Sequence, residues 1–143
     1  MRWYRWRAVR AVPRAAPQIA LFLLFHDPAQ APRLPHSVGL QRGLTGVVHL
    51  FADREYRGEN DIVIAHELLH TFGATDKYDL ATGAPLFPDG YADPEQRPRF
   101  PQRRAEIMAG RIPLAENDQV MAADFAETVV GPATAREIGW PPS

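Results

Sequence analysis

The apolar residues of this 143-residue chain cluster into two short runs and one longer, helix-like stretch. Residues 18–25 lie between prolines, and the length of this run fits a buried strand better than a helix. Residues 46–52 predict a second strand. A helix is then expected to begin near Asn60 or Asp61, which are both good N-cap residues, and to end near Phe72.

The predicted helix carries a nearly continuous apolar surface. Its apolar side chains can share one face, because residues three and four apart lie on the same side of a helix; they are Ile62, Ala65, Leu69 and Phe72. Gly73 follows in the position where a left-handed backbone ends many helices. We therefore expect a central, well-buried helix that stops at Gly73.

The second half of the chain is rich in proline and has little periodicity. Residues 77–106 predict a long ordered loop, of a kind that often carries function in compact domains. Residues 132–138 predict a short helix with Pro132 at its first position and Gly139 at its end. The chain as a whole predicts a single α+β domain, in which a small mixed sheet from residues 18–52 packs on the central helix.

Composition narrows the classes of function. The chain has no cysteine, which excludes disulfides, a thiolate zinc site and a cysteine nucleophile. Any metal site must use histidine, carboxylate or carbonyl ligands, which suits a catalytic zinc. The net charge is −1, and the arginines of residues 1–17 stand without any acid, so the remainder is acidic on balance. We therefore expect no nucleic acid partner.

Residues 1–17 form a separate basic and aromatic arm, in which Trp3, Tyr4 and Trp6 stand among arginines. One interpretation is a loosely docked terminus without a specific function. The other is a weak contact with a membrane surface, with the arginines facing anionic lipid. The longest apolar run, residues 19–25, is too short to span a membrane and lacks a signal-peptide cleavage site. A cytoplasmic location is the default expectation, and a fragment of a membrane-associated protein is the alternative.

The residues with the clearest chemistry lie at the end of the predicted helix. They spell H-E-x-x-H-x-x-G-x-x-D and are His66, Glu67, His70, Gly73 and Asp76. Because the two histidines are four residues apart on a helix, they can point at one cation. Gly73 lets the backbone turn, so Asp76 can return as a third ligand. Two surface histidines on an exposed helix are the alternative, but the apolar residues around them predict burial, where histidines need partners.

This arrangement suits a hydrolytic zinc site. Zinc in such sites takes three protein ligands and keeps one position open for water. It lowers the pKa of that water to about 7. Glu67 follows the first ligand, and can accept the proton and pass it to the leaving amine. We therefore predict Zn²⁺ as the cofactor and a peptide or protein as the substrate.

Other side chains could supply the third ligand. They are the remaining histidines, a neighbouring carboxylate and two downstream glutamates, namely His26, His36, His49, Asp79, Glu95 and Glu106. The histidines are expected in or beside strands or in loops. A downstream glutamate would act as in thermolysin-like enzymes, but Gly73 and the proline-rich sequence around Glu95 make that arrangement less favourable than Asp76.

The motif, with Lys77 and Tyr78 after it, resembles the metzincin superfamily of zinc endopeptidases. It is most similar to the small snapalysin-like branch, which has aspartate as the third ligand and a D-x-Y sequence at this point. Metzincins also carry a Met-turn, whose methionine lies beneath the histidines. Residues 107–110, Ile-Met-Ala-Gly, match this turn in type and in order along the chain.

The resemblance implies a zincin-like fold and a role for each motif residue. The ligands would be His66, His70 and Asp76, the general base Glu67 and the floor of the site Met108. Tyr78 would either donate a hydrogen bond to the oxyanion or cap the helix end. The match covers residues 60–79 and 106–111 and is thin elsewhere.

We therefore predict an arm at residues 1–17 and a zincin-like metalloprotease domain at residues 18–143. Residues 77–106 and the Met-turn would form the lower wall of the cleft. Residues 46–52 would form a cleft edge that pairs with an extended substrate. The alternative is a zinc-binding, metzincin-like interaction module with little or no catalytic activity.

Overall fold

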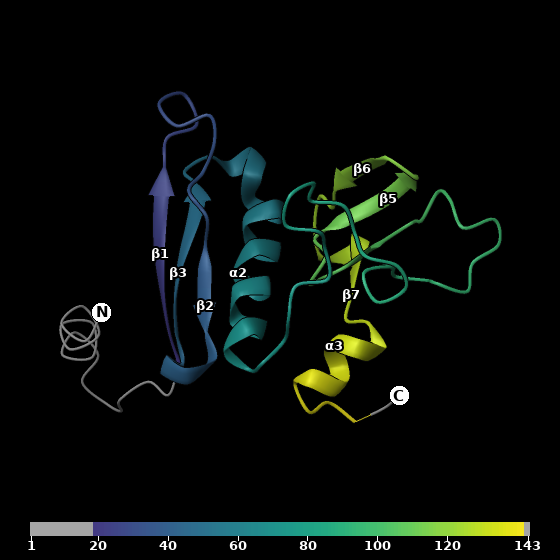
Figure 1. Cartoon of the computed structure of the whole chain (residues 1–143). Helices are drawn as coiled ribbons and strands as arrows, with labels where there is room; N and C mark the ends of the chain where they lie inside the picture. The colour runs from purple at the N-terminus through teal and green to yellow at the C-terminus, as the bar shows by residue number, and fades with distance from the viewer. Residues whose placement is uncertain (1–18, 142–143) are drawn as a thin grey trace.

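The main helix, α2 (Arg57–Thr71), lies between a three-stranded sheet and the C-terminal part of the chain (Figure 1). The computed structural model describes residues 19–141, so the arm predicted at residues 1–17 lies outside the described residues. The described part is a small mixed α+β domain, in agreement with the predicted fold class. Within it, no helix has the length and apolar character needed to cross a bilayer.

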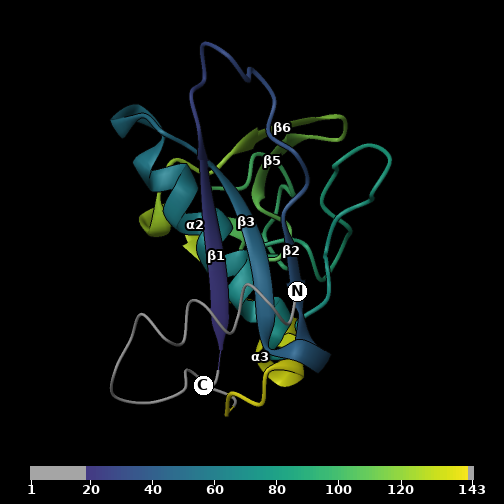
Figure 2. The same ribbon diagram turned by 90° about the vertical axis from the view of Figure 1, so that its left-hand side faces the viewer.

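The sheet has the strand order β1–β3–β2 and lies in front of α2 in Figure 2. β1 (Ala20–His26) and β3 (Thr45–Phe51) run parallel and correspond to the two predicted strands. β2 (Val38–Leu40) pairs antiparallel with β3 and was not predicted, because three residues carry too little periodicity. β3 pairs with β1 along its length and with β2 over Thr45–Val47, so it is the central strand of the sheet and not the edge strand that residues 46–52 were predicted to form.

Gly39 allows β2 to lie directly against α2. A Cβ atom at this position would collide with the carbonyl oxygen of Glu67 and would come within 2.9 Å of the Cβ of His70. The neighbouring strand β3 contributes Val48 and Leu50, both almost fully buried. The metal-motif segment of α2 is therefore held against the sheet by a backbone contact that no larger residue permits.

α2 begins earlier than predicted, at Arg57. It continues a 3₁₀ turn, Arg54–Tyr56, in which the side chain of Asp53 accepts a hydrogen bond from the N–H of Glu55. The side chain of Asn60 is engaged elsewhere: it accepts a hydrogen bond from the N–H of Phe51 and donates one to its carbonyl, at 3.1 and 2.9 Å. The predicted start at Asn60 or its neighbour was wrong because Asn60 extends the end of β3 and caps no helix.

The helix ends at Thr71, and Gly73 follows the cap residue Phe72 in the left-handed conformation, as predicted. Gly73 has a φ of +104° and donates its N–H to the carbonyl of His70 at 3.1 Å. The next N–H, of Ala74, donates to the carbonyl of Leu69 at 3.1 Å. These two bonds form a Schellman motif, which favours glycine at the left-handed position.

Two small apolar cores contribute to the packing of α2 and the C-terminal half. One contains Ile62, Ala105, Ile112 and Ala122. The other contains Ala74, Ile107 and Met108, with Ala65 and Leu69 of α2 packed against it. Phe72, in contrast, is 48% exposed. The helix is therefore central but only partly buried, and the predicted apolar face was wrong at Phe72.

The C-terminal half consists of short elements joined by irregular chain. These elements are β4 (Ala105–Glu106), β5 (Arg111–Ala115), β6 (Asp118–Met121), the 3₁₀ turn η3 (Phe125–Glu127), β7 (Thr128–Val129) and α3 (Pro132–Glu137). The 3₁₀ turns η1 (Gln41–Gly43) and η2 (Arg54–Tyr56) precede α2. The long loop before β4 and the helix α3, with Pro132 at its first position, were predicted. The β5–β6 hairpin and the parallel pair β4–β7 were not.

Replacing Gly39 by alanine should destabilise the protein by about 1–3 kcal/mol, because the new methyl group would push β2 away from α2. Urea unfolding followed by circular dichroism measures the change. Gly43→Ala is the matched control, since a Cβ there would meet no backbone atom of another element and would come closest to the side chain of Thr45, at 3.2 Å. An equal loss of stability in both variants would contradict the close approach of β2 and α2.

Candidate metal centre

The structure brings the three predicted ligands together. The Nε2 atoms of His66 and His70 lie 3.0 Å apart. Oδ1 of Asp76 lies 3.1 Å from the first nitrogen and 3.2 Å from the second. Among residues 19–141, this is the one set of three such side chains whose donor atoms lie close enough to share a metal ion.

Backbone carbonyl groups fix the orientation of both imidazole rings. Nδ1 of His66 contacts the carbonyl oxygen of Ile107 at 3.1 Å, and Nδ1 of His70 contacts that of Ala74 at 2.8 Å. Because a carbonyl can only accept a hydrogen bond, each Nδ1 must carry the proton. In its neutral form each ring therefore presents the lone pair of Nε2, which is the arrangement of a histidine metal ligand with its outer hydrogen bond in place.

When both rings are neutral, the two lone pairs point at the same small space, which a cation shared with Asp76 can occupy. Burial alone would lower the pKa of His66, but its hydrogen bonds to Asp76 and Ile107 and the nearby acids raise it overall. Zinc ligands about 2.0–2.1 Å from a tetrahedral ion lie about 3.3 Å from one another. The observed separations of 3.0 to 3.2 Å are close to that value, so the donor set fits such an ion.

Glu67 lies beside this centre with one oxygen left without a partner. Its side chain is on α2 and is buried. Within the described part of the chain, its Oε2 is the single buried side-chain polar atom that makes no hydrogen bond. Burial raises the pKa of Glu67, against the opposing pull of the two histidines. A carboxylate with a raised pKa and a free oxygen is suited to accept a proton.

The two predicted supporting residues lie around the centre. The ring of Tyr78 is 6.3 Å from that of His66, between centroids. Burial and the charges of Asp76 and Glu67 raise the pKa of Tyr78, which keeps its phenol protonated. Met108 is fully buried in the core against which the helix residues next to the two histidines pack. The roles that the resemblance implies for Tyr78 and Met108 stay predictions.

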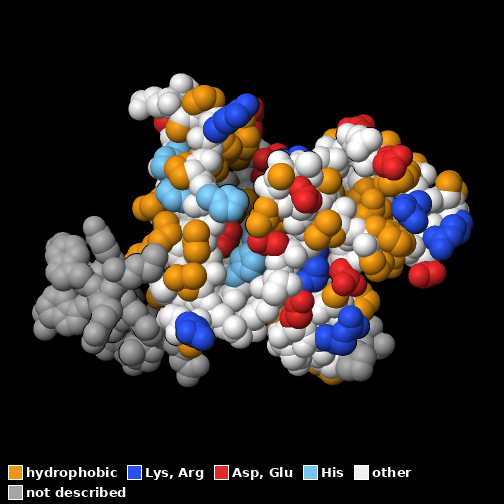
Figure 3. Space-filling view, viewed as in Figure 1, with side chains coloured by type: hydrophobic (Ala, Val, Ile, Leu, Met, Phe, Trp, Pro, Cys, Tyr) orange, Lys and Arg blue, Asp and Glu red, His pale blue; other side chains and the backbone are white. Residues whose placement is uncertain are grey.

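A cleft of about 420 Å³ opens in front of Glu67. Its walls include His36 from the segment before β2, His66 and Glu67 from α2, Tyr78 from the following loop and Arg111 from β5. In the space-filling view a hollow lies between the sheet side and the C-terminal half, and histidine and carboxylate side chains gather along it (Figure 3). Of the three donors, His66 lines this cleft, and His70 lines a second pocket beside β2.

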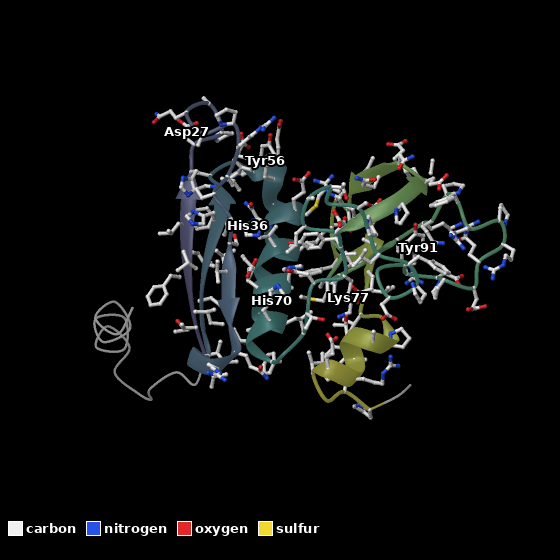
Figure 4. The ribbon with its side chains drawn as sticks, viewed as in Figure 1. Asp27, His36, Tyr56, His70, Lys77 and Tyr91 are labelled. Carbon is white, nitrogen blue, oxygen red and sulfur yellow. The ribbon has the colours of Figure 1, made fainter. Side chains whose placement is uncertain are left out.

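An ion pair that sequence reasoning missed holds the loop that carries Asp76. Nζ of Lys77 lies 2.8 Å from both carboxylate oxygens of Glu137. The same carboxylate accepts hydrogen bonds from the N–H and hydroxyl of Thr75, each at 2.9 Å. Lys77 lies between α2 and α3 (Figure 4). The residues on either side of Asp76 are therefore fixed to α3.

A buried glutamate anchors the turn that contains Met108. Oε2 of Glu106 accepts a hydrogen bond from the N–H of Met108 at 2.6 Å. Its Oε1 accepts from the N–H of Gly131 at 3.0 Å and from the hydroxyl of Thr134 at 2.6 Å. Both oxygens are satisfied, so this residue supports the turn whose Ile107 carbonyl orients His66. It is not available as a metal ligand.

The other rival ligands also lie outside the centre. His26 and His49 contact each other at 2.8 Å across the sheet. Oδ1 of Asp79 accepts hydrogen bonds from its own loop, and Glu95 is exposed and lies near Arg97. His36 lines the cleft without joining the three-residue group. Among the described residues, Asp76 is the third donor that the geometry favours.

Comparisons of the chain with protein-family models, with curated proteins and with solved structures found no match. The metzincin resemblance therefore stays a prediction from the sequence. What the site can do follows from the geometry of its own residues.

Replacing Glu137 by glutamine should lower the free energy of unfolding by about 1–2 kcal/mol at neutral pH, because it leaves the buried ammonium of Lys77 without its charged partner. Burial by itself would raise the pKa of Glu137, but hydrogen bonds from Lys77 and Thr75 lower it overall. The carboxylate's contribution is therefore present above its unfolded pKa, near 4.5, and is lost as pH falls through the lower folded value.

Urea unfolding of wild type and Glu137→Gln at a series of pH values from neutral to acid measures this effect. The difference between the two proteins should shrink toward acid pH. Glu95→Gln is the control, since that side chain is 89% exposed and lies 3.9 Å from its arginine partner. A pH-independent difference, or the same loss in the control, would contradict the assigned role of Glu137.

Proposed function

We propose that the protein is a zinc-dependent peptidase with a minimal, metzincin-like domain. One observation carries the proposal: two Nε2 atoms and a carboxylate oxygen converge on one point, and the unpartnered Oε2 of Glu67 lies beside them at a cleft. Histidine and carboxylate donors without cysteine suit a catalytic zinc better than a structural one. The Met108 turn beneath the centre supports the metzincin-like assignment.

The positions of the residues suggest a separate role for each of them in the reaction. A bound zinc ion would polarise the attacking water and the scissile carbonyl. Glu67 accepts the proton of that water at Oε2 and delivers it to the nitrogen of the leaving amine. Tyr78, kept protonated by its surroundings, can donate a hydrogen bond to the developing oxyanion.

The shape of the cleft supports a peptide as the substrate. Residues 34–37, which lead into the edge strand β2, form part of its wall together with Tyr78 and Gly110 on the opposite side. An extended chain can lie along such an edge and form backbone hydrogen bonds there. The substrate proposed from the sequence is thus retained, with residues 34–37, which precede β2, in place of β3 as the pairing edge.

A library of fluorogenic peptides tests the proposal. The zinc-loaded protein should hydrolyse members of the library, and removal of zinc by a chelator should abolish hydrolysis until zinc is added back. Glu67→Gln should lower kcat by about 10²–10⁴-fold while leaving zinc bound, because it removes the proton acceptor and none of the ligands. Glu59→Gln, on the same helix but outside the cleft, should retain the wild-type rate.

Each other outcome has a definite meaning. Hydrolysis that survives in Glu67→Gln or in the chelated protein would contradict the assigned mechanism. Stoichiometric zinc without hydrolysis of any peptide would overturn the peptidase and favour the zinc-binding interaction module.

A further inference from the structure

The cleft wall holds few charged side chains, and one of them is an arginine. The chain has a net charge of −1 and carries 17 acidic side chains. The single carboxylate in the cleft wall is that of Glu67, the proposed proton acceptor. The ionisable residues of the wall that have no assigned part in the reaction are His36, His49 and Arg111. Of these three residues Arg111 carries a permanent positive charge, which can attract a negatively charged group on the ligand.

The backbone of Arg111, whose side chain is exposed, is held in place by the turn that contains Met108. Arg111 is the first residue of β5 and pairs with Met121 of β6. The preceding residue, Gly110, donates its N–H to the carbonyl of Glu106 at 2.9 Å, which closes the turn that contains Met108. The turn that orients His66 through the Ile107 carbonyl therefore also sets the position of this arginine.

The guanidinium of Arg111 has no partner within the described residues, where it forms neither an ion pair nor a hydrogen bond. Its Nε lies 3.8 Å from the position that a Cβ atom at residue 83 would occupy. Gly83 belongs to the loop that lines the cleft. The acid of that loop, Asp79, uses its carboxylate to accept bonds from the loop's own Thr82. The arginine is thus left available to a ligand.

Arg111 is also the permanent positive charge of the cleft. Burial and the nearby His26 ring lower the pKa of His49, so His49 is neutral at neutral pH. An arginine keeps its charge and offers a planar fork of N–H donors, which matches the two oxygens of a carboxylate.

We propose that Arg111 determines specificity by binding a carboxylate of the peptide substrate, so that the cleft prefers peptides with an acidic residue near the scissile bond. This inference rests on the proposed peptidase function and names its substrate class. The carboxylate can come from a glutamate or aspartate side chain or from the C-terminus of the peptide. In both cases the same guanidinium binds it.

Peptide binding to the zinc-loaded Glu67→Gln protein, measured by fluorescence anisotropy, tests the inference without turnover. One peptide series carries glutamate at each position in turn with an amidated C-terminus. The second series carries glutamine instead, and the third combines glutamine with a free C-terminal carboxylate. Each series is measured with Arg111 intact, with Arg111→Gln and Arg111→Lys added, and with Arg136→Gln, an exposed arginine outside the cleft, as the control.

At least one glutamate position should bind about 5-fold more tightly than its glutamine match, the gain expected of a partly exposed charge pair. Arg111→Gln should remove this preference, Arg111→Lys should restore part of it, and Arg136→Gln should keep all of it. A gain confined to the free-carboxylate series, and lost in Arg111→Gln, would identify the C-terminus as the carboxylate. Equal binding of all three series, or a preference that survives Arg111→Gln, would overturn the inference.

Hydrolysis by the wild type separates this inference from the proposed function. An active enzyme without an Arg111-dependent preference removes the specificity proposal alone. A protein that hydrolyses nothing but binds acidic peptides through Arg111 removes the peptidase and keeps the carboxylate site.

Discussion

The candidate centre depends on two backbone carbonyl groups that accept hydrogen bonds from the histidine rings. The carbonyl of Ile107 fixes His66, and that of Ala74 fixes His70. Each bond commits Nδ1 to its proton and turns Nε2 toward the other ring, so two lone pairs face each other at 3.0 Å. When both rings are neutral, a cation between the nitrogens relieves this arrangement; without a metal, a proton on His66, whose pKa is raised, does the same. The Schellman end of α2 and the Met108 turn place the two carbonyls.

The rest of the C-terminal half supports these two carbonyls with polar contacts, since its apolar cores are small. Glu106 is fully buried, with both oxygens satisfied, and joins the Met108 turn to α3. Glu137 fixes the chain on both sides of Asp76 through Lys77 and Thr75. Buried polar groups that are fully paired favour one arrangement of the backbone. The loop that carries the third donor is therefore ordered without being covered by a large core.

The parts that the sequence predicted are those with local signals. Gly73 could be recognised as the helix end, and the spacing of His66, His70 and Asp76 allowed their convergence to be foreseen. The start of the helix was predicted wrongly because the side chain of Asn60 makes hydrogen bonds to the backbone of Phe51 at the end of β3. This tertiary contact leaves no signal in the local sequence. The pairing of Lys77 with Glu137 spans 60 residues and could not be inferred from either residue alone.

Titration of the metal-free protein with Zn²⁺ by calorimetry tests the central claim most directly. The wild type should bind one zinc ion per chain. His70→Ala should bind it more than about 100-fold more weakly, because removing a ligand costs more than disturbing an outer hydrogen bond. Asp76→Ala should be weakened as well. No binding by the wild type, or unchanged affinity in His70→Ala, would contradict the convergence of these side chains on a metal ion.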